Sequence, residues 1–163
     1  LVGSEMCIRD RNMTDDSIEI IENAILKRLK ESEELKGFDI EPYPVDISKF
    51  DFISAKGCVL VRYESSSYTK PQTLACVTQD ETFEFSVFIA LRYLKKYADS
   101  YPWLRIVKRL LTGLRIKGKQ LYPAKRQFVD IVKGDLYWGY SFNITLPAQE
   151  DRTMSNVIPL WET

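Results

Sequence analysis

Basic side chains gather in one stretch of the sequence, and their chemistry is the binding of anions. Eleven lysines and arginines lie between Arg92 and Arg126, against the single acid Asp99. This stretch, called here the basic segment, has a formal charge of +10, whereas the rest of the chain from Met13 onward holds 10 basic and 20 acidic residues. Guanidinium and ammonium groups bind phosphates and carboxylates, so a nucleic acid or an acidic protein surface is the expected partner. The candidate interface residues are Arg105, Lys108, Arg109, Arg115, Lys117, Lys119, Lys125 and Arg126.

The charge of the whole chain bears on the choice between these partners. The sequence is neutral, with 23 basic and 23 acidic residues, whereas a free-standing DNA-binding domain is usually net basic. Neutrality with separated charges favours a head-to-tail ring, in which the basic patch of one copy meets the acidic patch of the next. A nucleic-acid surface and an ordinary solvated face remain the alternatives.

Residue types that serve most enzymes are missing or isolated. The chain has no histidine, which removes the commonest general base, the usual partner of a nucleophilic serine or cysteine, and the commonest metal ligand. Cys7, Cys58 and Cys76 show no CxxC spacing, so zinc-ribbon and thioredoxin-type sites are excluded. We expect Cys58 and Cys76 to be half-buried, reduced thiols in strands, with a disulfide between them as the alternative. The sequence predicts no catalytic, metal or cofactor site.

Two weaker patterns have ordinary structural explanations. Gly113 and Gly118 are followed by Lys119 and Gln120, which lack the Ser or Thr of a phosphate-binding loop. Trp138, Tyr140 and Phe142 are aromatic and could stack bases, but their strict alternation along a strand predicts core positions instead. No apolar run approaches the ~20 residues that a membrane-spanning helix requires.

Two amphipathic helices are expected to support the basic segment. In residues Asp16–Leu35 the isoleucines and leucines recur at helical spacing, and Gly37 follows as a helix terminator. In residues Tyr101–Leu114, Pro102 fits the first turn and five apolar residues form a stripe that leaves Lys108 and Arg109 outside it. A loop with two glycines, Gly113–Lys119, follows the second helix.

Alternating and apolar runs predict the strands of one sheet. Glu81–Leu91 is the clearest, with Phe83, Phe85, Val87, Ile89 and Leu91 on one face. Polar residues Ser65–Gln72 are expected to form a loop. The order of elements predicts an α+β fold, with a mixed, mainly antiparallel twisted sheet and both helices packed on one face. The other expected strands are Phe38–Tyr43 at an edge, Gly57–Glu64, a short Thr73–Thr78, and a hairpin of Gln127–Val132 with Leu136–Leu146.

The chain length of 163 residues suits a single domain. Residues 1–12 have neither helical nor strand periodicity and resemble translated sequencing-adapter read-through, so we expect them to be a non-native leader, with a disordered natural N-terminus as the alternative. Residues 13–150 are expected to form one α+β domain, and residues 151–163 a C-terminal tail.

Several short runs carry a resemblance to a known family. They are Gly57–Glu64, Gly113–Arg115, Leu121–Pro123, Phe128–Asp130 and Tyr140–Ala148. Together they resemble the tail-gene protein family of Mu-like contractile-tailed phages and prophages, over nearly all of residues 13–150. The resemblance contains no catalytic signature.

The resemblance implies a small, non-enzymatic structural protein of the virion tail, assembled in the cytoplasm of a bacterial host. Proteins similar to tail terminators are α+β subunits that form a ring, here a hexamer, at the head-proximal end of the tail. The implied partners are other copies of the chain, the tail tube and sheath, and head-completion proteins, with DNA only as cargo through the ring and no membrane. The alternative from the residues themselves is a nucleic-acid-binding protein that uses residues 92–126.

Overall fold

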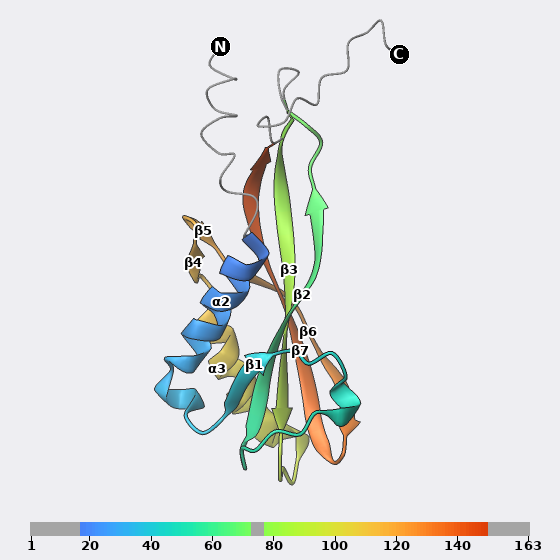
Figure 1. Cartoon of the computed structure of the whole chain (residues 1–163). Coiled ribbons are helices and arrows are strands. Elements are labelled where there is room, and N and C mark those ends of the chain that lie inside the picture. The colour runs from blue at the N-terminus through green and yellow to red at the C-terminus, as the bar shows by residue number, and fades with distance from the viewer. Residues whose placement is uncertain (1–16, 73–76, 150–163) are drawn as a thin grey trace, which may run out of the picture.

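The computed structural model describes residues 17–72 and 77–149, which form two α-helices, one large sheet and short accessory elements (Figure 1). The leader predicted at 1–12 and the tail predicted at 151–163 lie outside these ranges. The helical elements are α2 (Ser17–Lys30), η2 (Glu33–Leu35), η3 (Ile47–Lys49), η4 (Tyr97–Ser100) and α3 (Tyr101–Leu111). The strands are β1 (Asp39–Pro42), β2 (Gly57–Tyr68), β3 (Thr78–Leu91), β4 (Arg115–Ile116), β5 (Lys119–Gln120), β6 (Tyr122–Val132) and β7 (Asp135–Gln149).

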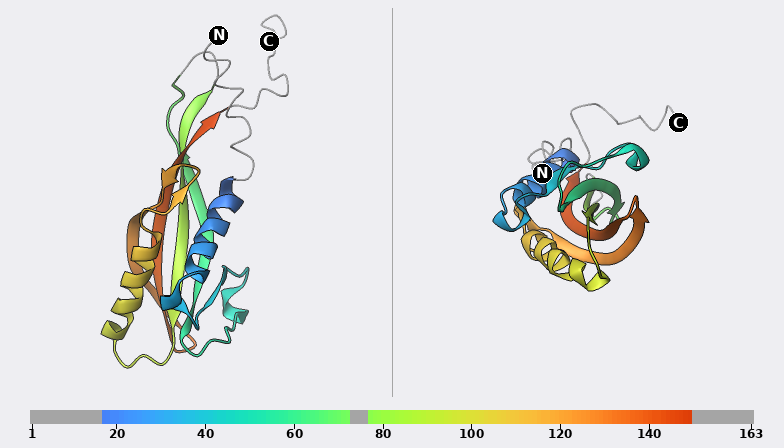
Figure 2. Two further views of the ribbon diagram at one scale, coloured as in Figure 1. Left: turned by 90° about the vertical axis from the view of Figure 1, so that its left-hand side faces the viewer. Right: turned by 90° about the horizontal axis from the view of Figure 1, so that it is seen from below.

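The large sheet has five strands in the order β1-β2-β3-β7-β6. β1 pairs with β2 in parallel, and the other three pairs are antiparallel. The sheet is twisted and curls around its long axis, as the view from below in Figure 2 shows. The predicted α+β fold with a mixed, mainly antiparallel sheet is therefore confirmed, as is the position of residues 39–42 at an edge of the sheet.

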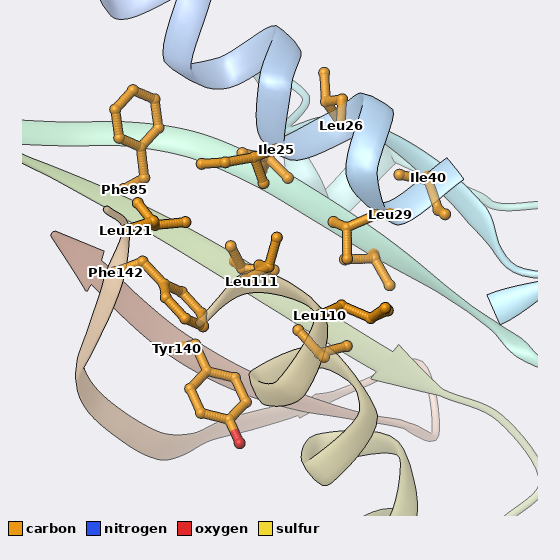
Figure 3. Packing of buried hydrophobic residues seen from close by; sticks show 14 of the residues in the cluster. Ile25, Leu26, Leu29, Ile40, Phe85, Leu110, Leu111, Leu121, Tyr140 and Phe142 are labelled. Carbon is orange, nitrogen blue, oxygen red and sulfur yellow. The ribbon is translucent and has the colours of Figure 1, made fainter. Parts of the chain in front are cut away.

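The main core lies between this sheet and the two helices, which cover the same face of it. Ile21, Ile25 and Leu29 of α2 pack in one cluster with the apolar stripe of α3 and with β2, β3 and β7. Figure 3 shows side chains of α2 and α3 pointing toward Phe85 and Phe142 of the sheet. The face predicted for the clearest strand is confirmed, because all five of its residues are buried: Phe83, Phe85, Val87, Ile89 and Leu91.

A smaller cluster covers part of the opposite face of the sheet. Phe52 lies on the segment between β1 and β2 and packs with Cys58, Leu60, Ala90 and Tyr137. Cys58 is fully buried rather than half-buried as expected, and the removal of the thiolate from water raises its pKa to about 12. Cys76, its alternative disulfide partner, lies outside the described residues.

Three strands continue beyond the helices as an arm formed by residues 65–68, 78–82 and 145–149 (Figure 1). The prediction of a polar loop at Ser65–Gln72 is wrong for its first half, since Ser65–Tyr68 pair with Glu81–Glu84 of β3. Serine favours turns, but cross-strand pairing overrides that preference here. The short strand predicted at 73–78 lies largely outside the described residues, and β3 begins at Thr78.

Both predicted helices end earlier than expected. α2 stops at Lys30, and Glu33–Leu35 form a separate 3₁₀ turn in which the Ser32 hydroxyl accepts a hydrogen bond from the Glu34 amide. α3 stops at Leu111, where Gly113 follows with a φ of +82°. The expected loop at Gly113–Lys119 instead contains the β4–β5 hairpin, whose turn residues Lys117 and Gly118 both have positive φ.

Candidate interaction surface

α3 presents its basic residues to solvent because its apolar stripe faces the core. Leu104, Val107, Leu110 and Leu111 are buried, which leaves the basic residues on the outer side of the helix. Of these, Arg109 already forms an ion pair with Glu34 of η2, on an exposed part of the surface. The two without an ion pair to a described carboxylate are Arg105 and Lys108.

The β4–β5 hairpin carries three of the predicted residues. Arg115 and Lys119 are exposed, whereas Lys117 is half-buried. The Lys117 ammonium donates a hydrogen bond to the Ser17 hydroxyl at 3.1 Å, which ties the hairpin to the start of α2. Lys117 therefore has a structural contact, whereas the exposed side chains of Arg115 and Lys119 can bind a partner.

Consecutive residues of β6 point to opposite faces of the sheet. Lys125 lines a hollow on the face away from the helices, together with Arg62 and Glu84. Arg126 lies on the helix face, where its guanidinium donates to the Tyr140 hydroxyl at 3.1 Å. The eight predicted residues therefore do not form one continuous patch.

Arg92, at the start of the basic segment, has a structural role. Its guanidinium lies 3.7 Å from the ring centroid of Phe52 and donates to the backbone oxygens of Phe52 and Ser54. It also pairs with Asp135 at 3.4 Å and with Asp51 at 3.7 Å. These contacts join the segment between β1 and β2 to the β6–β7 turn, so Arg92 is not a binding residue.

Sequence reasoning missed a hollow of about 390 Å³ between α3 and β6. Tyr101, Leu104 and Arg105 of α3 line it together with Arg126. The buried Tyr140 connects the two walls, because its hydroxyl donates to the Leu104 carbonyl at 2.9 Å and accepts from Arg126. The spacing of Tyr101 and Arg105, one helical turn apart, was the only signal of this site in the sequence.

The basic and acidic parts of the chain include opposite edges of the sheet, but they meet where the two helices lie on one face of it. The sheet order puts β1 and β6 at opposite edges. α2 contacts β1 and β2 and α3 is bonded to β7 next to β6, but the two helices also contact each other, and Figure 2 shows them as neighbours from below. Residues 17–91 hold 13 acidic and 8 basic side chains, a net charge of −5, against +10 for the basic segment. The charge separation in the sequence therefore corresponds to the two edges of the sheet, whereas the helices bring basic and acidic residues into contact, as in the ion pair of Arg109 with Glu34.

The aromatic residues of β7 belong mainly to the core. Tyr140 and Phe142 are buried, as predicted, so neither ring is available to stack a base. Trp138 is half-buried and packs edge-on against Tyr97 and Phe128. Among residues 17–72 and 77–149, no three His, Cys, Asp or Glu side chains group as metal ligands. None of the described helices is long and apolar enough to cross a membrane.

Fold and surface together define an α+β protein with one curled sheet, two helices on one face, and charges of opposite sign at its two edges. Residues 25–160 match the family model described as Gp37 protein, and the chain belongs to this family. None of the curated proteins matches the chain. Among solved structures it is similar to a chain from the virion of a native gene transfer agent particle. The two are 11% identical with a TM-score of 0.56, and the match covers 80% of this chain and 97% of that chain, which shows a shared fold.

Proposed function

We propose that the chain is a structural protein of a phage or prophage virion, and that within the virion it is the tail terminator. Membership of the Gp37 family supports the first part, as does the fold shared with a chain of a gene transfer agent virion. The short runs that resemble tail-gene proteins of Mu-like phages support the second part. In this role the chain assembles in the host cytoplasm, caps the head-proximal end of the tail, and has no enzymatic activity.

The observation that carries the ring is the opposite charge of the two edges of the sheet. A ring needs a heterologous contact, in which two different surfaces of one subunit meet and the rotation between copies closes. The side formed by α3, the β4–β5 hairpin and β6 is basic, and residues 31–56, which include β1 at the opposite edge of the sheet, hold seven acidic and three basic side chains. We propose that these two sides meet between neighbouring copies and that six copies close the ring.

The proposed partners follow from the position of such a ring. One end of the ring contacts the tail tube and the sheath around it, and the other end contacts head-completion proteins. DNA passes through the ring without being read. The division of Lys125 and Arg126 between two faces, and the ion pairs of Arg92 and Arg109, argue against a continuous nucleic-acid surface on residues 92–126.

Deletion of the gene in the phage or prophage that encodes it tests the role directly. We expect electron micrographs of the deletion lysate to show tail tubes of unregulated length and heads without tails. Expression of the chain in trans restores tubes of uniform length. Normal tails in the deletion lysate would refute the terminator role.

A salt titration of DNA binding tests the alternative, a nucleic-acid-binding protein. Proteins that bind phosphates lose affinity steeply as salt rises, because each contact releases counterions. We expect only weak binding to duplex DNA at physiological salt. Tight binding at that salt, with a steep salt dependence, would favour the alternative over the ring.

A further inference from the structure

We propose that the hollow between α3 and β6 binds the carboxylate of an acidic side chain from the next copy of the chain, held by Arg105 and Arg126. This inference rests on the proposed ring and specifies one contact within it. The hollow lies on the basic side of the molecule, and two of the four residues that line it carry a guanidinium group. Its volume, about 390 Å³, falls within the roughly 300–1,000 Å³ typical of ligand clefts.

The two arginines have no carboxylate partner among the described residues, which also holds for Arg28 and Arg115 but not for three other arginines of the fold. Arg62, Arg92 and Arg109 each pair with an Asp or Glu of the same chain. Within the described residues, neither Arg105 nor Arg126 has a carboxylate at ion-pairing distance. A pair of like charges facing one hollow is unfavourable unless an anion lies between them. The hollow is therefore a site for an anion that the described part of the chain does not supply.

Arg126 is held in place before any partner arrives. Its guanidinium donates to the Tyr140 hydroxyl at 3.1 Å, and that hydroxyl donates in turn to the Leu104 carbonyl at 2.9 Å. Tyr140 is only 2% exposed, so core packing fixes this acceptor. A guanidinium group has five donors, and the remaining ones are available to a ligand. Preorganisation of this kind reduces the entropy lost on binding.

The chemistry of the site favours a carboxylate. The planar fork of a guanidinium group matches the two oxygens of a carboxylate in a bidentate hydrogen bond.

The acidic side of another copy is the occupant that the charges favour. Residues 17–91, which form α2 and the first three strands of the sheet, carry a net charge of −5. Several acids there, including Glu19, Glu33 and Glu41, have no ion pair with a described cation. A closed ring that joins the two sides would bring these acids to the basic side of every neighbour.

The double variant R105Q/R126Q tests the proposal against K95Q/K133Q, which removes the same charge from exposed positions outside the hollow and outside the candidate interface residues. The readout is the rate at which labelled subunits exchange out of assembled rings, measured on tail tubes of the parent phage. Loss of a desolvated charge pair acts mainly on dissociation, so we expect exchange about tenfold faster or more for R105Q/R126Q. The control should stay within about twofold of the wild type, because rim charges contribute little.

A second variant separates binding from folding. R105Q leaves the bond between Arg126 and Tyr140 intact, so its free energy of unfolding should equal that of the wild type while its exchange is still faster. Exchange at the wild-type rate in both hollow variants would overturn the proposal. Loss of duplex-DNA binding with unchanged exchange would also overturn it, since the hollow would then bind phosphate. Failure of the wild-type chain to form rings would refute the ring itself before any variant is compared.

Discussion

The hydroxyl of Tyr140 donates a hydrogen bond to the backbone carbonyl of Leu104 at 2.9 Å, inside the core. This bond joins β7 to α3, elements that are far apart in the sequence. The same hydroxyl accepts the hydrogen bond that holds Arg126, so the position of Arg126 on the basic side depends on a buried residue.

Tyr140→Phe should therefore lower the free energy of unfolding by about 1–2 kcal/mol, because the buried bond to Leu104 and the bond from Arg126 are both lost while the ring stays in place. Urea denaturation followed by fluorescence measures the change. Tyr93→Phe is the matched control, since its side chain is 85% exposed and it should cost nothing measurable. Equal stability of both variants would show that the two bonds contribute nothing.

Two aromatic residues of the sheet should differ in their contribution to stability. Phe85 is fully buried, so Phe85→Ala should cost about 3–5 kcal/mol in the free energy of unfolding. Trp138 is half-buried, and its truncation to Ala should cost clearly less than that of Phe85. The Trp138 indole N–H has no hydrogen-bond partner among the described residues. Trp138→Phe keeps the edge contacts and removes that unsatisfied donor, so it should cost about 1 kcal/mol or less.

The same urea denaturation measures all three variants. A greater loss for Trp138→Ala than for Phe85→Ala would contradict this ranking of burial. A large loss for Trp138→Phe would indicate that the indole makes an interaction that the described residues do not provide.

The parts of the fold that the sequence predicted are those in which one face of an element is apolar. The alternation in Glu81–Leu91 and the stripes of both helices depend only on local periodicity, and all three are confirmed. The strand at Ser65–Tyr68 could not be predicted, because its pairing partner lies across the arm and its own residues favour turns. Tertiary pairing is invisible to a local pattern.

The candidate surface was predictable in charge but not in geometry. The number of charges in each segment predicts which side is basic, but the register of the strand determines on which face of the sheet each side chain lies. The irregularity in β6 between Pro123 and Lys125 changes the register before Lys125 and Arg126 emerge on opposite faces. The hollow itself needs a contact between α3 and β6 through Tyr140, which sequence spacing alone does not reveal.

The thiol of Cys58 should react only when the chain unfolds. Its side chain is fully buried, and burial raises its pKa to about 12 from the ordinary value of about 9. In a variant with Cys7 and Cys76 changed to Ser, labelling by a thiol reagent near pH ~8 should be as slow as unfolding itself. Labelling faster than unfolding would show that a local opening exposes Cys58.

The raised pKa of Cys58 lowers the free energy of unfolding at high pH. Between pH 9 and about 12 the unfolded thiol has lost a proton that the folded thiol keeps, so the free energy of unfolding falls as the pH rises through this window. Burial raises the pKa of Tyr137 to about 12 as well, and this shift acts in the same direction. Cys58→Ala should make the fall shallower without abolishing it. An unchanged slope in urea titrations across this window would contradict the contribution of Cys58.

Reversing charges on the β4–β5 hairpin should slow assembly of the ring. Arg115, Lys117 and Lys119 are the predicted residues there, but Lys117 also bonds to Ser17, so its reversal disturbs the start of α2. The variant R115E/K119E leaves the bond between Lys117 and Ser17 intact. Because exposed charges act through steering, we expect association about tenfold slower at low salt, a difference that shrinks as salt rises, and an unchanged dissociation rate.

The matched control is K30E/K36E, which reverses two charges near the C-terminal end of α2, on the acidic side. If opposite sides meet, this control makes the acidic surface more negative and should associate at least as fast as the wild type. Light scattering after mixing, with and without tail tubes, measures the association rates of both variants. Equal slowing of the two variants would show that only net charge matters. Association of R115E/K119E at the wild-type rate at low salt would show that the hairpin does not take part in the contact between copies.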